Sequence, residues 1–100
     1  MARPRICRNI RFNPKITYFK PRGIQLKDLK EAVLHVDEYE AVRLKDLEGL
    51  EQDKCAQKME ISQPTFHRLV VSARKKIADA IIKGKAIKIE GGNYVFKGKN

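Results

Sequence analysis

The sequence lacks several features that would define a class of protein. It has no tryptophan, two cysteines and two histidines. Because Cys7 and Cys55 are far apart and few, they predict no disulfide framework. No second His or Cys lies at ligand spacing from His67, and His35 is isolated in an apolar stretch. We therefore predict no metal site and no other cofactor.

Long apolar runs and catalytic motifs are also missing. No run approaches the roughly 18 apolar residues that a membrane span needs, and the cationic start is not followed by the apolar segment of a signal peptide. We therefore expect no membrane partner and a cytoplasmic location. The motifs of phosphate-binding loops, zinc proteases and nucleophile elbows are absent, and Gly91-Gly92 joins two expected strands rather than a strand and a helix. We do not expect an enzyme.

Acidic residues are scarce relative to basic ones, and the excess of basic residues is uneven. The net charge is +10. Residues 1–22 contain seven Arg or Lys and no Asp or Glu, and residues 63–100 contain nine against two. Residues 23–62 reverse the balance, with six against ten. A charge distribution polarised in this way is typical of a nucleic-acid-binding protein, which would lie with the nucleoid.

Length and composition predict one domain, residues 1–100. An apolar fraction of 42% with 34% charged residues suits a globular chain with a modest core. We predict a mainly α protein with short β elements, of the α+β class. It would comprise a basic N-terminal arm (1–15), a three-helix core (37–82) and a β-hairpin (85–96), in a winged-helix-like arrangement.

The first predicted helix covers about Glu38 to Glu48. Asp37 precedes it as a candidate N-cap, and Glu40 follows three residues later, as in a capping box. Gly49 supplies the left-handed residue that ends the helix.

Two further helices follow with almost no linker. The second covers Gln52–Met59, and only Glu60 and Ile61 separate it from Ser62, a good N-cap for the third. Pro64 lies in the first turn, where a missing N–H has no consequence. The third helix runs to about residue 82. Two helices joined by so short a turn cross steeply, which is helix-turn-helix geometry.

These motifs resemble known DNA-binding sequences. The segment resembles region four of bacterial sigma factors through the letters LEGL, the I-S turn and cap, and the closing Ala73-Arg74-Lys75-Lys76. The whole chain resembles a family of small uncharacterised prokaryotic proteins predicted to bind DNA. That wider match lies in the RPR start, Thr17–Pro21, EYEAVRLKDLEGL, SQPTF and IEGGNY. Glu60 departs from the pattern, because the turn usually has Gly there, and a left-handed Glu would be strained.

Short strands are predicted on both sides of the helices. Residues 16–19 and 85–90 have strand composition, and residues 94–96 would return from Gly91-Gly92-Asn93 as a hairpin. The aromatic side chains of these strands are expected to be buried in the sheet, with base stacking as the alternative; they are Tyr18, Phe19, Tyr94 and Phe96. Because isolated hairpins are marginal, we expect a homodimer in which strand edges pair.

The candidate DNA contacts fall in three groups. On the third helix, base edges would be met by Gln63, Pro64, His67, Arg68 and Val71, with Arg68 suited to guanine and Gln63 to adenine. Phosphates would be met by Thr65, Ser72, Arg74, Lys75 and Lys76. The N-terminal arm would track the backbone or minor groove through Arg3, Arg5, Arg8 and Arg11.

The sequence therefore predicts a sequence-specific, double-stranded-DNA-binding transcriptional regulator. Two alternatives stay open. One is an RNA-binding or ribosome-associated basic module. The other is an adaptor that contacts RNA polymerase, as the resemblance to sigma region four implies.

Overall fold

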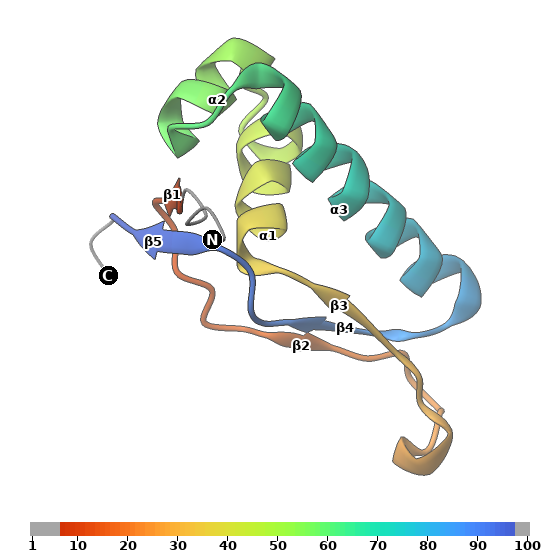
Figure 1. Ribbon diagram of the computed structural model, residues 1–100. Coiled ribbons are helices and arrows are strands. Elements are labelled where there is room, and N and C mark those ends of the chain that lie inside the picture. The colour runs from red at the N-terminus through yellow and green to blue at the C-terminus, as the bar shows by residue number, and fades with distance from the viewer. Residues whose placement is uncertain (1–6, 98–100) are drawn as a thin grey trace, which may run out of the picture.

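The structure is a computed structural model that describes residues 7–97, and it confirms the predicted α+β class (Figure 1). The helical elements are α1 (Val36–Val42), the π-helical segment η2 (Arg43–Leu47), α2 (Gln52–Met59), α3 (Gln63–Lys83) and a short 3-10 turn, η1 (Leu26–Asp28). The strands are β1 (Arg8–Ile10), β2 (Tyr18–Phe19), β3 (Glu31–Leu34), β4 (Ala86–Ile89) and β5 (Tyr94–Phe96). None of the helices in this part of the chain is long and apolar enough to cross a membrane.

The three predicted helices pack around one apolar cluster. Phe66 of α3 is fully buried there, together with Leu44 and with Cys55 and Met59 of α2. The bounds predicted for α2 are confirmed, and so is the inward position of Cys55. Burial of these side chains, at about 1.5–3 kcal/mol each, holds α2 against α3.

The predicted start of the first helix is wrong by two residues. His35 is the N-cap of α1, and its backbone amide donates to the Glu38 carboxylate at 2.9 Å in the capping box. Asp37 therefore does not cap the helix; it lies inside the first turn, buried, with its carboxylate 3.8 Å from the Arg8 guanidinium. The capping box is displaced from the Asp37–Glu40 pair because Glu38 is the residue that lies three positions after the true cap.

After Val42 the helix continues as η2, in which the turn is wider than an α-turn. The amide of Glu48 donates to the carbonyl of Arg43, five residues back. The wider turn moves Leu47 off the face that buries Leu44, and Leu47 is exposed. Gly49 ends the segment with φ of 74°, as predicted.

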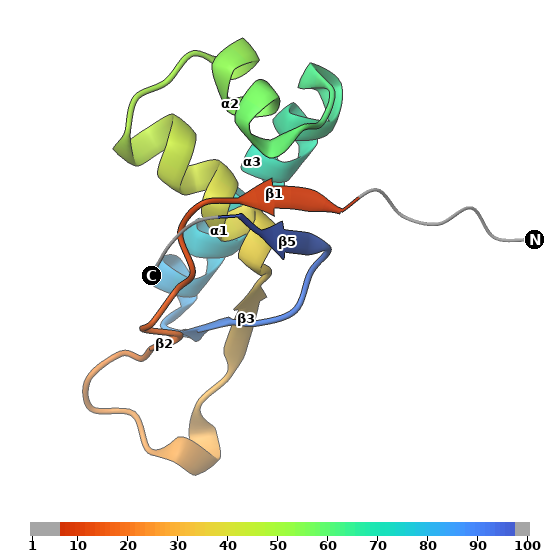
Figure 2. The same cartoon turned by 90° about the vertical axis from the view of Figure 1, so that its left-hand side faces the viewer.

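The strands form two small sheets. The three-stranded sheet has the order β2-β4-β3, with β3 and β4 parallel and β2 antiparallel to β4. Strands β1 and β5 form a parallel pair between the helices and this sheet (Figure 2). Ile10 of β1 is fully buried in a second apolar cluster, with Leu34, Ile89 and Ala73 of α3. Through this second cluster, α3 packs along one side of the three-stranded sheet (Figure 1).

The predicted hairpin at residues 85–96 is wrong, although both of its strands exist. The strand after Gly91-Gly92 pairs with β1 rather than with β4. Gly91 accepts a hydrogen bond from the amide of Val36, and a Cβ on Gly92 would lie 2.7 Å from the Asp37 carboxylate. The two glycines thus allow the backbone to approach the start of α1 closely, which directs the chain away from β4.

Two other predictions for the β elements are corrected. The first strand of the three-stranded sheet covers only Tyr18–Phe19, and both of its aromatic side chains are exposed, as is Tyr94. Phe96 alone of the four aromatic residues packs partly against the core. Because β2 and β5 pair within the chain, unpaired strands no longer argue for a dimer.

The turn between α2 and α3 gives a testable result on stability. Glu60 has φ of 55°, the strained left-handed conformation that the sequence predicted. Glu60→Gly should raise the free energy of unfolding by about 0.5–1 kcal/mol, because glycine removes a penalty of about 1–2 kcal/mol while adding backbone entropy to the unfolded state. Urea unfolding measures the change. Glu60→Ala is the control, since it keeps a Cβ in the same conformation and should give no gain.

Candidate nucleic-acid interface

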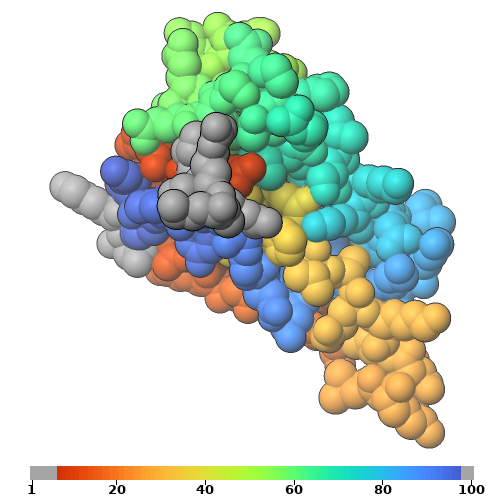
Figure 3. Space-filling model, in the orientation of Figure 1, coloured from red at the N-terminus to blue at the C-terminus, as the bar shows by residue number. Residues whose placement is uncertain are grey.

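The start of α3 is fixed by its cap and by the turn before it. The Ser62 hydroxyl accepts a hydrogen bond from the amide of Thr65 at 3.3 Å and donates to the Thr65 hydroxyl at 2.9 Å. Pro64 lies in the first turn of the helix. The predicted cap is therefore confirmed. In the space-filling view the first half of α3, in green and teal, forms the surface beside α2, on the far side of the molecule from η1 (Figure 3).

Six of the predicted contact residues lie on the solvent side of α3. All six have exposed side chains; they are Gln63, Pro64, His67, Arg68, Val71 and Lys75. Within the described residues, Gln63, His67 and Lys75 make no side-chain hydrogen bond or ion pair, while Arg68 donates to the Thr65 hydroxyl at 3.3 Å. This surface, which we call the outer face of α3, offers amide, imidazole, guanidinium and ammonium donors to a ligand.

Ser72 and Lys76 lie beside the outer face of α3 and contact α1 instead of solvent. The Ser72 hydroxyl and the Lys76 ammonium both donate to the buried Glu38 carboxylate, the latter at 2.7 Å. Burial would raise the pKa of Glu38, but the hydrogen bonds from Lys76, Ser72 and the His35 amide outweigh burial and lower it. Both residues are thus occupied in joining α3 to α1, and we no longer assign them to phosphates.

Arg74 and Thr65 are also engaged within the protein. The Arg74 guanidinium donates to the Asp46 carboxylate of η2 at 2.9 Å, and this hydrogen bond lowers the pKa of Asp46. Thr65 is half-buried in the cap, and its hydroxyl already accepts hydrogen bonds from Ser62 and Arg68. The pairs Glu38–Lys76 and Asp46–Arg74 fix α3 against α1 and η2 at two points along its length.

Of the predicted N-terminal arm, the structure describes the residues from Cys7 onward. Arg3 and Arg5 lie outside the described residues. Arg8 belongs to the extended strand β1, but its side chain is half-buried next to Asp37, so we no longer assign it to the DNA backbone or minor groove. Arg11 is exposed, while its backbone amide donates to the Glu40 carboxylate at 2.7 Å.

The acidic residues of α1 are neutralised inside the protein. Glu40 is fully buried and accepts two hydrogen bonds from Arg43, at 2.7 and 3.0 Å. Asp37 and Glu38 face Arg8 and Lys76. Sequence analysis counted these carboxylates only as part of the acidic stretch of residues 23–62 and missed their pairing. The signal was present in the spacing of Ser72 and Lys76, which lie four residues apart and therefore share one side of a helix.

Within residues 7–97, no group of three or more His, Cys, Asp or Glu side chains is arranged to hold a metal ion.

The fold and the outer face of α3 define a small basic α+β protein in which two helices support a third, projecting one. By sequence, the chain belongs to the family described as protein of unknown function DUF134, whose model matches residues 1–97, and its relatives carry the name UPF0251. This confirms the family resemblance seen in the sequence; the likeness to sigma region four stays a prediction.

The relatives match along nearly all of the chain. A UPF0251 protein of Caldanaerobacter subterraneus is 57% identical over 100 residues, which are 100% of this chain and 85% of that protein. One from Thermoanaerobacter pseudethanolicus is 56% identical over 94 residues, covering 94% and 80%. One from Moorella thermoacetica is 56% identical over 98 residues, covering 98% and 66%. No solved structure matches the chain.

The Glu38 contacts predict how stability depends on pH. The pKa of Glu38 is lower in the folded than in the unfolded protein, so the unfolded state binds more protons between these two pKa values. The stability that ionised Glu38 contributes is therefore present above the unfolded pKa and is lost as pH falls through the folded pKa. Glu38→Gln should lower the free energy of unfolding at pH 7 by about 1–3 kcal/mol. When the pH falls from 7 to about 3, the free energy of unfolding of Glu38→Gln should decrease less than that of the wild type.

Thermal unfolding between pH 7 and pH 3 measures both effects. Gln63→Ala, on the exposed start of α3, is a control that adds no titratable group and leaves the Glu38 contacts unchanged. Parallel pH profiles for Glu38→Gln and the wild type would contradict the assignment.

Proposed function

We propose that this protein is a sequence-specific double-stranded-DNA-binding transcriptional regulator that inserts the first half of α3 into the major groove. The observation that supports this best is the outer face of α3: its donors are exposed, largely unpaired within the described residues, and located directly after a tight turn from α2. In a helix-turn-helix protein, residues near the start of the second helix contact base edges.

The roles within the outer face follow from side-chain chemistry. Arg68 can donate two hydrogen bonds to guanine, and Gln63 can donate to and accept from adenine. His67 and Val71 are the exposed residues one and two turns after Gln63 on the same face of α3. Lys75, one turn further on, carries a point charge suited to a phosphate, which would set the position of α3 without reading sequence.

The electrostatics of the remaining chain support the same proposal. The carboxylates of α1 are paired with Arg8, Arg43 and Lys76, so their repulsion of a polyanion is reduced. The net charge of +10 then acts mainly through cations that lack such partners. Released counterions would supply sequence-independent affinity that falls with salt.

The exposed aromatic residues of β2 do not favour the RNA-binding alternative. The Tyr18 hydroxyl donates to the Glu31 carboxylate at 2.7 Å, which places a negative charge beside the ring that would have to stack on a base. Phe19 lies on the other side of the strand, where it lines an apolar groove.

Two substitutions on α3 separate base reading from phosphate binding. Arg68→Ala should weaken binding to the preferred duplex by about 1–3 kcal/mol and relax specificity at one base pair. Lys75→Ala should weaken binding to all sequences alike and reduce the salt slope by about one unit. Affinities are measured by fluorescence anisotropy on a duplex selected from a random pool, at several salt concentrations.

Lys27→Ala is the matched control, because Lys27 is exposed in η1, far from α3's first half (Figure 1). Identical effects of Arg68→Ala and Lys75→Ala on every duplex would contradict base reading. Tighter binding to single-stranded or structured RNA than to any duplex, or binding to RNA polymerase without affinity for DNA, would favour one of the other two classes.

A further inference from the structure

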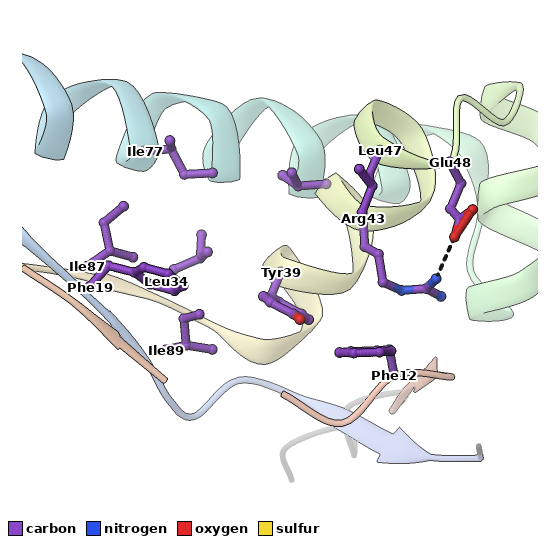
Figure 4. A pocket seen from close by; sticks show the side chains of 11 residues that line it. Phe12, Phe19, Leu34, Tyr39, Arg43, Leu47, Glu48, Ile77, Ile87 and Ile89 are labelled. Atoms are coloured by element: carbon purple, nitrogen blue, oxygen red, sulfur yellow. Dashed lines mark hydrogen bonds and ion pairs between the residues drawn. The ribbon is translucent and has the colours of Figure 1, made fainter. Parts of the chain in front are cut away.

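An apolar groove of about 440 Å³ lies between α3 and the three-stranded sheet. Figure 4 shows Ile77 of α3 on one side and Leu34, Ile87 and Ile89 of the sheet on the other. The end of the groove next to η2 is formed by Phe12, Tyr39, Arg43, Leu47 and Glu48. Apart from the Tyr39 hydroxyl, its only polar groups are those of Arg43 and Glu48, which face each other at 3.3 Å.

The groove is the open side of the second apolar core. Leu34 and Ile89 belong to that core and are nearly buried, while Ile77 and Ile87 pack against it and stay partly exposed. α3 therefore covers only part of the apolar face of the sheet. A surface built in this way resembles a core cut in half, as in obligate homodimers.

Large apolar side chains project around the groove. The exposed fraction is 50% for Phe12, 53% for Phe19 and 79% for Leu47. Ile81, 70% exposed, lines a second hollow together with Phe19 and Ile87, which also line the groove, so the two hollows are neighbours. At about 150–200 Å² per large side chain, these four expose on the order of 400 Å². That is about half of the ~800 Å² that each partner buries in a standard interface, before the groove itself is counted.

We infer that this groove is the interface through which two copies of the chain form a symmetric homodimer. Projecting side chains and a hollow lie on the same face, so one patch can supply both sides of the contact between two copies, as a two-fold axis requires. The charged side chains at this end of the groove are already paired within one copy, because Arg43 contacts both Glu40 and Glu48. The inference replaces the strand-edge dimer that the sequence suggested.

A second copy fits the groove better than a small molecule does. Binding pockets for small ligands bury about 70–90% of the ligand's surface. Here the side chains at the margin stand half or more exposed, so a small apolar molecule would leave both itself and Phe12 and Leu47 in contact with water. Exposed apolar surface of this size matches the largest patch on a typical monomer, and such patches are often interaction sites.

Sedimentation equilibrium of the full chain at tens of micromolar tests the inference, without nucleic acid. The wild type should have twice the 11.5 kDa chain mass. Leu47→Glu should raise the dimer dissociation constant at least about 100-fold, because the two-fold axis brings two carboxylates into an apolar contact. Leu26→Glu is the matched control: Leu26 is 72% exposed in η1, away from the groove, and its substitution should leave the dimer unchanged.

A wild-type monomer at about 200 µM would overturn the inference, as would equal dissociation constants for Leu47→Glu and Leu26→Glu. A monomer whose groove binds a naphthalene sulfonate dye, with binding lost in Leu47→Glu, would also overturn it and assign the groove to small molecules. Circular dichroism checks the fold of each variant. If Leu47→Glu does not fold, Ile81→Glu takes its place with the same expected result, and an intact dimer in that variant would refute the interface.

Discussion

The buried Glu38 carboxylate fixes the position of α3 relative to α1, on which the rest of the structure depends. It accepts hydrogen bonds from the His35 amide at the start of α1 and from the Ser72 and Lys76 side chains of α3. A single side chain thus joins the cap of one helix to the middle of another. Removing one partner of such a group would leave a charge without compensation in a place that water hardly reaches. The direction in which α3 leaves the molecule depends on this group and on the Asp46–Arg74 pair.

That arrangement divides the basic residues of α3 between two tasks. Those that face α1 and η2 orient the helix, whereas Arg68 and Lys75 remain available to a ligand. The letters Ala73-Arg74-Lys75-Lys76 suggested one continuous basic face. Because a helix turns 100° per residue, consecutive cations point in different directions, and only the contacts with α1 and η2 decide which of them are free.

Local patterns were sufficient to predict much of the fold. The bounds of α2, the Ser62 cap and the left-handed Glu60 all depend on interactions within a few residues, and all are confirmed. The hairpin failed because Gly91-Gly92 has the composition of a turn, while the conformation is set by a distant partner, the start of α1. The pairing of β1 with β5 brings together segments that are far apart in the sequence, and no local pattern predicts it. The same holds for the segments that line the groove.

The parallel pair β1–β5 has a consequence for how the chain matures. Its two strands lie at opposite ends of the sequence, Arg8–Ile10 and Tyr94–Phe96, and Ile10 fills the core beneath them. Contacts between such distant segments close last, since the loop between them must be ordered first. During synthesis, β1 therefore has no partner strand until β5 has been made, and the core that Ile10 fills closes only then.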